Sequence, residues 1–187
     1  MRYAQGEVYS LPLPHSVDHV EALGKHALVV GSDGKDLHFT SVRLARLPVT
    51  VDRYTQKNSA QGETRSHGFF YQPESEFDGL LGLPIIGGGD AAAGQLRRES
   101  AGVLFLRNHA LSLGDLGRLD ARPAGKERND GCRASCVDWY GNSRPLFLRG
   151  RIFALMGYEI VEGKLDQQRI VETRRIDFSP APLLINR

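Results

Sequence analysis

The chain of 187 residues contains little cysteine, only Cys132 and Cys136. Two thiolates cannot complete a four-ligand structural zinc site, and a gap of three residues differs from the thioredoxin-type Cys-x-x-Cys motif. Two interpretations stay open: a short-range disulfide formed in an oxidising compartment, or two free structural thiols. We expect neither a metal nor a cofactor at this pair.

The sequence also lacks long apolar runs. No stretch approaches the 18 apolar residues of a transmembrane helix, so we expect no membrane span. The first residues, Met1 to Glu7, contain no apolar segment of the kind found in a signal peptide. The compartment stays open: the protein is cytoplasmic, or it is exported with its leader absent from this chain.

An excess of charge of one sign is missing as well. The 24 basic side chains nearly balance the 22 acidic ones, leaving a net charge of +2. This balance gives no electrostatic case for binding nucleic acid or an anionic membrane. Nineteen of the basic residues are arginine. The excess of arginine indicates either a codon bias or a surface that binds phosphate or carboxylate groups.

Helical periodicity is absent over any window of 11 or more residues, whereas short apolar runs separated by turn residues are frequent. The run 27–30, an Asp-Gly turn and the run 37–44 predict a β-hairpin. In its second strand, Leu37, Phe39, Ser41 and Arg43 should share one face. Three further hairpins are expected: 68–71 with 80–86, 103–106 with 110–113 across a turn at 108–109, and 146–148 with 152–156 across a turn at 149–150.

The tetrapeptide Leu-Phe-Leu-Arg occurs twice, at 104–107 and 146–149, which is a spacing of 42 residues. The first strands of the four expected hairpins, anchored at Val29, Phe70, Phe105 and Phe147, also recur at intervals near 40 residues. This period is typical of propeller blades. The sequence therefore predicts an all-β, propeller-like array of about four blade units, with an incomplete ring as one arrangement. A β-sandwich or barrel is the alternative, and a mixed α/β fold is least favoured.

We expect one β domain over residues 1–187, with an N-terminal arm at 1–16 and a C-terminal tail at 179–187. The segments 21–31, 66–71 and 151–157 resemble the strand–turn–strand pattern in the C-terminal part of bacterial β-propeller repeat proteins. The resemblance covers about residues 17–178 and implies blade-like hairpins. It carries over no catalytic residue. A partial ring would expose apolar blade faces, so it also implies a protein partner or self-association.

Two polar clusters are candidate ligand-binding sites. Glu63, Arg65 and His67 alternate, so an extended strand would place a carboxylate, a guanidinium and an imidazole on one face. The structural alternative is a solvated edge with one ion pair. The second cluster is the tetrad Asp138, Trp139, Tyr140 and Arg144, whose aromatic and charged groups suit a binding hot spot or a sugar platform. Its structural alternative is a packing tryptophan followed by a turn.

Other motifs argue against specific chemistries. His15 and His19 are four apart, but the nearby prolines oppose a helix that would align them as metal ligands. Asp33 and Asp36 flank Gly34 in a hairpin turn and lack the spaced ligands of a calcium loop. No catalytic motif is evident. We therefore predict a non-enzymatic binding scaffold that engages a protein or other ligand through its loops; a hydrolase or lyase acting on a polar or sugar-like substrate is the alternative.

Overall fold

The computed structural model describes residues 8–62, 68–87, 101–121 and 143–178. In these ranges the chain is all-β, as predicted, and forms thirteen strands and no helix. The first four strands form an antiparallel sheet, sheet A, in the order β1-β2-β3-β4. Their bounds are β1 His19–Leu23, β2 His26–Ser32, β3 Leu37–Arg43 and β4 Val49–Gln56.

Sheet B contains β5 Ser59–Gln61, β6 Phe70–Pro73, β7 Asp78–Gly87, β8 Ala101–His109 and β9 Ser112–Asp120. β5 pairs with the end of β7 and β6 pairs with its beginning, while β8 pairs along almost all of β7. Since a strand has only two edges, β5 and β6 must share the edge of β7 that β8 leaves free. Sheet B is therefore a four-stranded meander whose first strand is interrupted.

Sheet C is again an antiparallel meander, in the order β10-β11-β12-β13. Its strands are β10 Ser143–Leu148, β11 Arg151–Met156, β12 Glu159–Asp166 and β13 Arg169–Asp177. A β-bulge in the β12–β13 pairing lies between Glu162 and Gly163. Two-residue turns join these strands, and positive φ angles at Arg149 (51°) and Gly150 (73°) fit the mirror-image turns that hairpins prefer.

The four expected hairpins are all present, with one correction. The turn between β8 and β9 lies at Ala110 and Leu111, with φ angles of 51° and 74°, and not at residues 108–109. Asn108 instead pairs with Leu113 in the ladder of β8 and β9, and its buried side-chain amide has three hydrogen-bond partners. The amide donates to the carbonyl oxygen of Phe77 and to the hydroxyl of Tyr71, and it accepts from the backbone N–H of Leu111.

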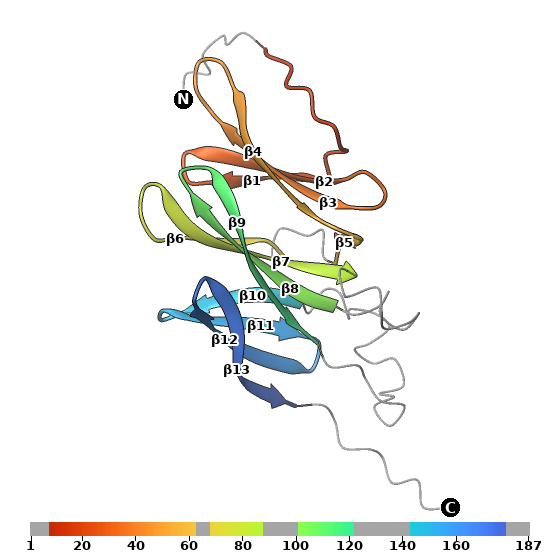
Figure 1. The fold of residues 1–187 in the computed structure, drawn as a ribbon, viewed down its shortest axis with the longest axis vertical. Helices are drawn as coiled ribbons and strands as arrows, with labels where there is room; N and C mark the ends of the chain where they lie inside the picture. Colours follow the sequence, from red (N-terminus) through yellow and green to blue (C-terminus); the bar gives the residue numbers. More distant parts are fainter. Residues whose placement is uncertain (1–7, 63–67, 88–100, 122–142, 179–187) are drawn as a thin grey trace, which may run out of the picture.

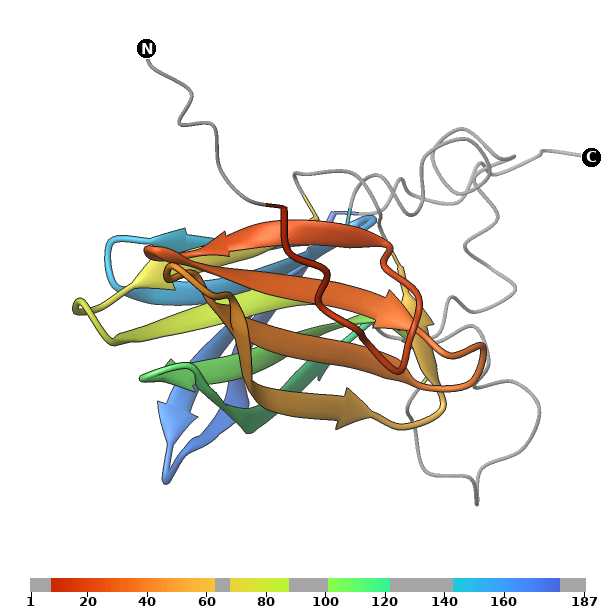
Figure 2. The same cartoon turned by 90° about the horizontal axis from the view of Figure 1, so that it is seen from above.

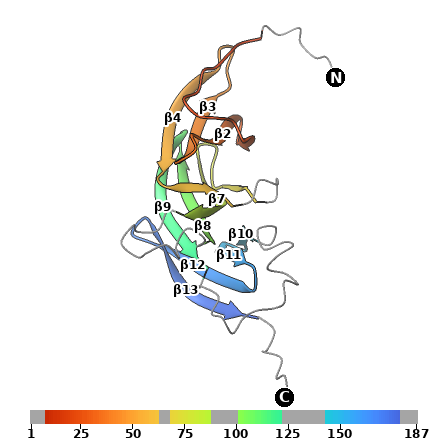
Figure 3. The ribbon, with the colours of Figure 1, turned by 90° about the vertical axis from the view of Figure 1, so that its right-hand side faces the viewer.

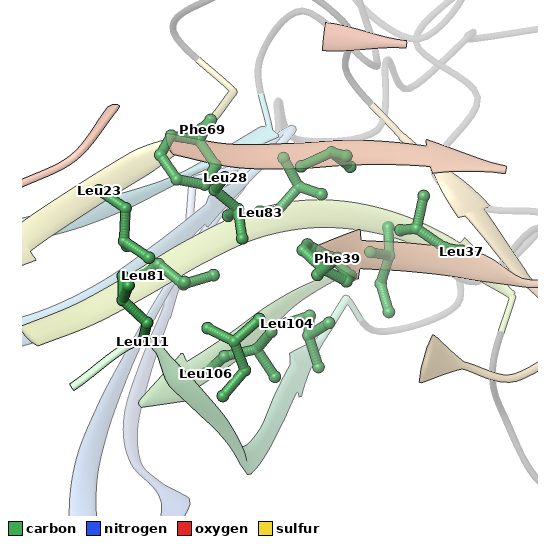
Figure 4. Close-up of a cluster of buried hydrophobic side chains, with 13 residues drawn as sticks. Leu23, Leu28, Leu37, Phe39, Phe69, Leu81, Leu83, Leu104, Leu106 and Leu111 are labelled. Atoms are coloured by element: carbon green, nitrogen blue, oxygen red, sulfur yellow. The ribbon is translucent and has the colours of Figure 1, made fainter. Parts of the chain in front are cut away.

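The three sheets stack face to face, with sheet B in the middle (Figure 1). Between sheets A and B lies a buried apolar cluster (Figure 4). In β3 the predicted alternation holds as far as the bulge after Ser41: Leu37 and Phe39 enter this cluster, and the Ser41 hydroxyl donates to the carbonyl oxygen of Leu111 in sheet B at 2.6 Å. Full burial of such side chains contributes about 1.5–3 kcal/mol each.

A second apolar cluster lies between sheets B and C. Neighbouring residues of one strand enter different clusters: Leu80 faces sheet C, whereas Leu81 faces sheet A. In β8, Val103 and Phe105 likewise face sheet C, and Leu104 and Leu106 face sheet A. Coverage of both faces explains why β7 and β8 contain continuous apolar runs without alternation.

The predicted number of units differs from the structure. The units anchored at Phe70 and Phe105 belong to the same sheet, because β6 and β8 are both in sheet B. The four units predicted from the sequence thus correspond to three sheets among the described residues. The strand pairings there close neither a ring nor a barrel, and the sheets form a curved stack (Figure 3).

Candidate binding surface on the outer face of sheet C

Most of the side chains predicted to bind a ligand lie outside the described residues. These are Glu63, Arg65, His67, Asp138, Trp139 and Tyr140, and the two cysteines, Cys132 and Cys136, lie there too. The exception is Arg144, which lies in β10 at the edge of sheet C. Its side chain is exposed, and the register places it opposite Leu155 of β11. Arg144 therefore lies on the face of sheet C that points away from sheet B.

The two faces of sheet C differ in what covers them. In β11, Ile152, Ala154 and Met156 point into the cluster shared with sheet B. Alternation therefore points Phe153 and Leu155 to the opposite, outer face, where both are only partly buried. No other sheet among the described residues packs on this outer face.

Two rows of outward-pointing residues cross all four strands of sheet C. The registers give one row as Arg144, Leu155, Ile160 and Ile176, and the next row as Leu146, Phe153, Glu162 and Arg174. Paired residues on one face lie about 5 Å apart, so the apolar members of the two rows are contiguous. Leu148 extends this apolar area along β10 and is 61% exposed, and Ile176 is 50% exposed. We call this set of residues the outer C face.

One ion pair crosses the outer C face. The guanidinium of Arg151 donates two hydrogen bonds to the Glu162 carboxylate, both of 2.7 Å, and lies 4.8 Å from the ring centre of Phe153. The two parallel hydrogen bonds orient the Arg151 guanidinium, which lies over the ring of Phe153. Hydrogen bonds from Arg151 lower the pKa of Glu162, and the same bonds raise the pKa of Arg151. Glu162 is thus held as a carboxylate that is already neutralised.

The remaining charges of the two rows are basic. Arg144 lies on the β10 edge and Arg174 lies on the β13 edge, so cations border the apolar centre on both sides. Glu162 is the single carboxylate in the rows, and Arg151 occupies it. Two of the nineteen arginines thus lie at opposite edges of this face.

At the opposite end of the stack, part of the chain itself packs on the outer face of sheet A. Residues 8–18 run over the outer face of sheet A (Figure 2). His15 is buried there; its ring stacks on that of His38 with centroids 5.1 Å apart, and its Nε2 lies 2.8 Å from the Thr40 hydroxyl oxygen. The chain passes so close that a Cβ added to Gly31 would lie 1.7 Å from the carbonyl oxygen of Ser16. The outer face of sheet A is thus partly covered by residues 8–18, although Val20 on this face stays 58% exposed.

A carboxylate, an imidazole and a hydroxyl meet on sheet A, but they hold a turn together. Nε2 of His38 lies 2.9 Å from a carboxylate oxygen of Asp33, and its Nδ1 lies 3.1 Å from the Thr55 hydroxyl. The other Asp33 oxygen accepts the backbone N–H groups of Lys35 and Asp36. These bonds, led by that of Asp36, lower the pKa of Asp33. The geometry is that of a hairpin turn, as the sequence predicted.

A small open pocket lies where the β8–β9 turn meets the β12–β13 turn, and its volume is about 190 Å³. It is lined by Arg107, His109, Asp115 and neighbouring residues. Arg107 already pairs with Glu74 at 2.8 Å, and His109 already pairs with Asp78. Arg107 and His109 are therefore already held by carboxylates outside the pocket lining, and we assign no catalytic role to the pocket.

Neither a metal site nor a membrane-spanning helix is found in the part of the chain that the structure describes. No three metal-ligating side chains gather there, and His15 and His19 lie on opposite faces of sheet A. No described helix has the length and apolar character needed to cross a bilayer.

Comparison with known proteins adds no assignment. No family model matches the chain, and neither the curated proteins nor the solved structures contain a match to it.

The outer C face could not have been recognised from the sequence, because Phe153, Leu155 and Ile160 belong to apolar runs that read like core. Arg144 was singled out only as a neighbour of Trp139 and Tyr140.

Proposed function

We propose that this chain is a non-enzymatic binding scaffold that engages a protein partner through the outer C face. The observation that carries the proposal is the pair of rows on sheet C, whose apolar members are contiguous and lie on a face against which no other described sheet packs. Exposed contiguous apolar areas bordered by polar groups are typical of interaction sites.

The propeller-like arrangement is part of the same proposal. Sheets A and C are four-stranded meanders, sheet B is a meander with its first position shared by β5 and β6, and the sheets stack in chain order. The last strand of sheet B, β9, contacts the last strands of its neighbours, β4 and β13. Consecutive blades of a propeller are related in this way. On this reading the outer C face is the surface on which the next blade-like layer would pack.

The test compares the size of the native assembly for two matched variants. Leu148→Lys with Ile176→Lys places two charges on the outer C face, and Leu44→Lys with Leu47→Lys places two charges on exposed residues near sheet A. All four side chains are at least half exposed, so both variants should fold.

A tagged chain is expressed in the cells that make it, and the extract is analysed by size-exclusion chromatography. We expect the wild type and the Leu44/Leu47 variant to elute as a larger complex, and the Leu148/Ile176 variant to elute at the size of a single chain. Elution of the wild type as a single chain would overturn the proposal.

A further inference from the structure

The two interfaces between neighbouring sheets show what kind of surface packs against a sheet of this chain. The cluster between sheets A and B and the cluster between sheets B and C both consist of aliphatic and aromatic side chains from two facing sheets. Stacked sheets pack about 10 Å apart, and their common twist keeps the two surfaces in contact. The outer C face carries the same types of side chain, on a sheet with the same strand order.

The interface between sheets B and C also shows how a charge is accommodated beside such a cluster. Arg175, on the inner face of β13, donates to Glu159 at 2.7 Å, to Glu172 and to the backbone carbonyl of Asp120 in sheet B. The cation is thus matched by acceptors of its own sheet and of the facing sheet. On the outer C face, Arg144 and Arg174 flank an apolar centre that offers them no carboxylate beyond the one bound by Arg151.

Charge decides between a second copy of this chain and a different partner. Two outer C faces laid against each other would bring the basic borders of both into one interface, with two occupied carboxylates between them. Like charges placed together in an interface repel each other and suppress that pairing. A partner with carboxylates at its border gains from the same cations.

We infer that the outer C face receives a β-sheet of another protein, with an apolar centre and with carboxylates facing Arg144 and Arg174. This inference rests on the proposed function and specifies its partner. The partner sheet forms a fourth layer of the stack, and its twist matches that of sheet C.

The first step of the test identifies what touches the face. A photo-crosslinking benzoylphenylalanine replaces Leu146 on the outer C face or, as a control, Val20, which points outward from sheet A and is 58% exposed. Cells that make the protein are irradiated, and the cross-linked segment is sequenced. We expect a segment of a different protein that forms a β-strand with acidic residues nearby.

The second step measures affinity with the purified partner. Arg144→Glu with Arg174→Glu should raise the Kd roughly 10- to 100-fold, and added salt should weaken wild-type binding. The matched control, Arg43→Glu with Arg46→Glu, makes the same charge changes at exposed residues at the end of β3 and in the β3–β4 connection, and it should leave the Kd within about twofold.

The outcomes separate this inference from the proposed function. Cross-linking at position 146 no stronger than at position 20 would defeat both. A cross-link to a second copy of this chain, a cross-link to a helix, or a Kd indifferent to the charge reversal would overturn the inference and leave the binding scaffold standing. The chain could instead sediment with vesicles of phosphatidylserine and phosphatidylcholine, and the Arg144/Arg174 variant could fail to do so. That result would identify a lipid surface, and not a protein, as the partner and would overturn both proposals.

Discussion

Phe105 and Phe147, the aromatic residues of the two Leu-Phe-Leu-Arg copies, contact each other edge to face across the interface between sheets B and C. Their ring centres are 6.2 Å apart, with an interplanar angle of 84°. The two copies are not equivalent, because Phe105 lies in the inner strand β8 and Phe147 lies in the edge strand β10. The two copies of the repeated tetrapeptide thus contact each other through their aromatic rings.

We predict that this aromatic pair is energetically coupled. A double-mutant cycle with Phe105→Leu and Phe147→Leu should give a coupling free energy of about 0.5–1.5 kcal/mol, since edge-to-face rings attract beyond their burial. Urea unfolding of the four proteins measures it. A cycle between Phe105 and the exposed Phe77 should give no coupling, and equal values for both cycles would contradict the prediction.

Gly82 is required by the close approach of sheets B and C. A Cβ at this position would lie 2.5 Å from Cβ of Pro145 and 3.2 Å from the ring of Phe105. Gly82→Ala should therefore lower the free energy of unfolding by about 1–3 kcal/mol through overpacking. Gly114→Ala is the control, because the nearest atom there is the Arg107 oxygen at 4.0 Å. Similar losses for both variants would refute the steric explanation.

Arg175 and Arg174 are neighbours in sequence and should differ strongly in importance. The side chains of Arg175 and Glu159 are 8% and 6% exposed and form an ion pair, whereas Arg174 is exposed. Arg175→Leu removes the buried guanidinium that pairs with Glu159 at 2.7 Å and should cost about 3–5 kcal/mol. Arg174→Leu should change stability by less than about 0.5 kcal/mol. Thermal and urea unfolding of the two variants provide the comparison, and equal stabilities would be the contrary result.

Asp36 should make part of the stability acid-sensitive. Hydrogen bonds from the Asn58 N–H and from Lys57 lower the pKa of this buried carboxyl below its ordinary value of 3.8. A folded-state pKa below that of the unfolded state means that the stabilisation is complete above the unfolded value. It is lost as the pH falls through the folded value.

The Asp36→Asn variant isolates this contribution. At pH 7 its urea midpoint should lie below that of the wild type, and the gap should shrink as the pH falls below about 4, because the wild-type carboxyl becomes neutral too. The comparison with the wild type at each pH removes the effect of the other carboxylates. A gap that stays constant down to pH 2.5 would contradict the assignment.

The sequence predicted the strands of the four hairpins because their signals are local, whereas the other described strands, β1, β4, β5, β12 and β13, lie outside the predicted hairpins. Alternation identified β3, and the Asp-Gly turn identified its hairpin with β2. The number of sheets could not be predicted, because the apolar runs around Leu81 and Phe105 reveal strands without showing that they pair with each other. The spacing of 35 residues between Phe70 and Phe105, shorter than the others, was the sign that both belong to one sheet.

The candidate surface was less predictable than the fold. Phe153 and Leu155 alternate with Ile152 and Ala154, so both faces of β11 are apolar in sequence. Which of these faces is covered depends on how sheet C stacks on sheet B, and that is a property of the whole array. Arg144 was noted for its aromatic neighbours, whereas its position opposite Leu155 follows from the strand register.

The most direct test of the account measures the accessibility of Leu148 in the native assembly. Leu148→Cys is introduced with Cys132→Ser and Cys136→Ser, and its maleimide labelling rate is compared between the purified protein and an extract of the cells that make it. Leu47→Cys is the control, because its side chain is equally exposed but distant from sheet C. The account predicts that labelling at position 148 is at least roughly tenfold slower in the extract, since only unbound molecules react, and unchanged at position 47. Equal labelling rates at position 148 in both preparations would contradict it.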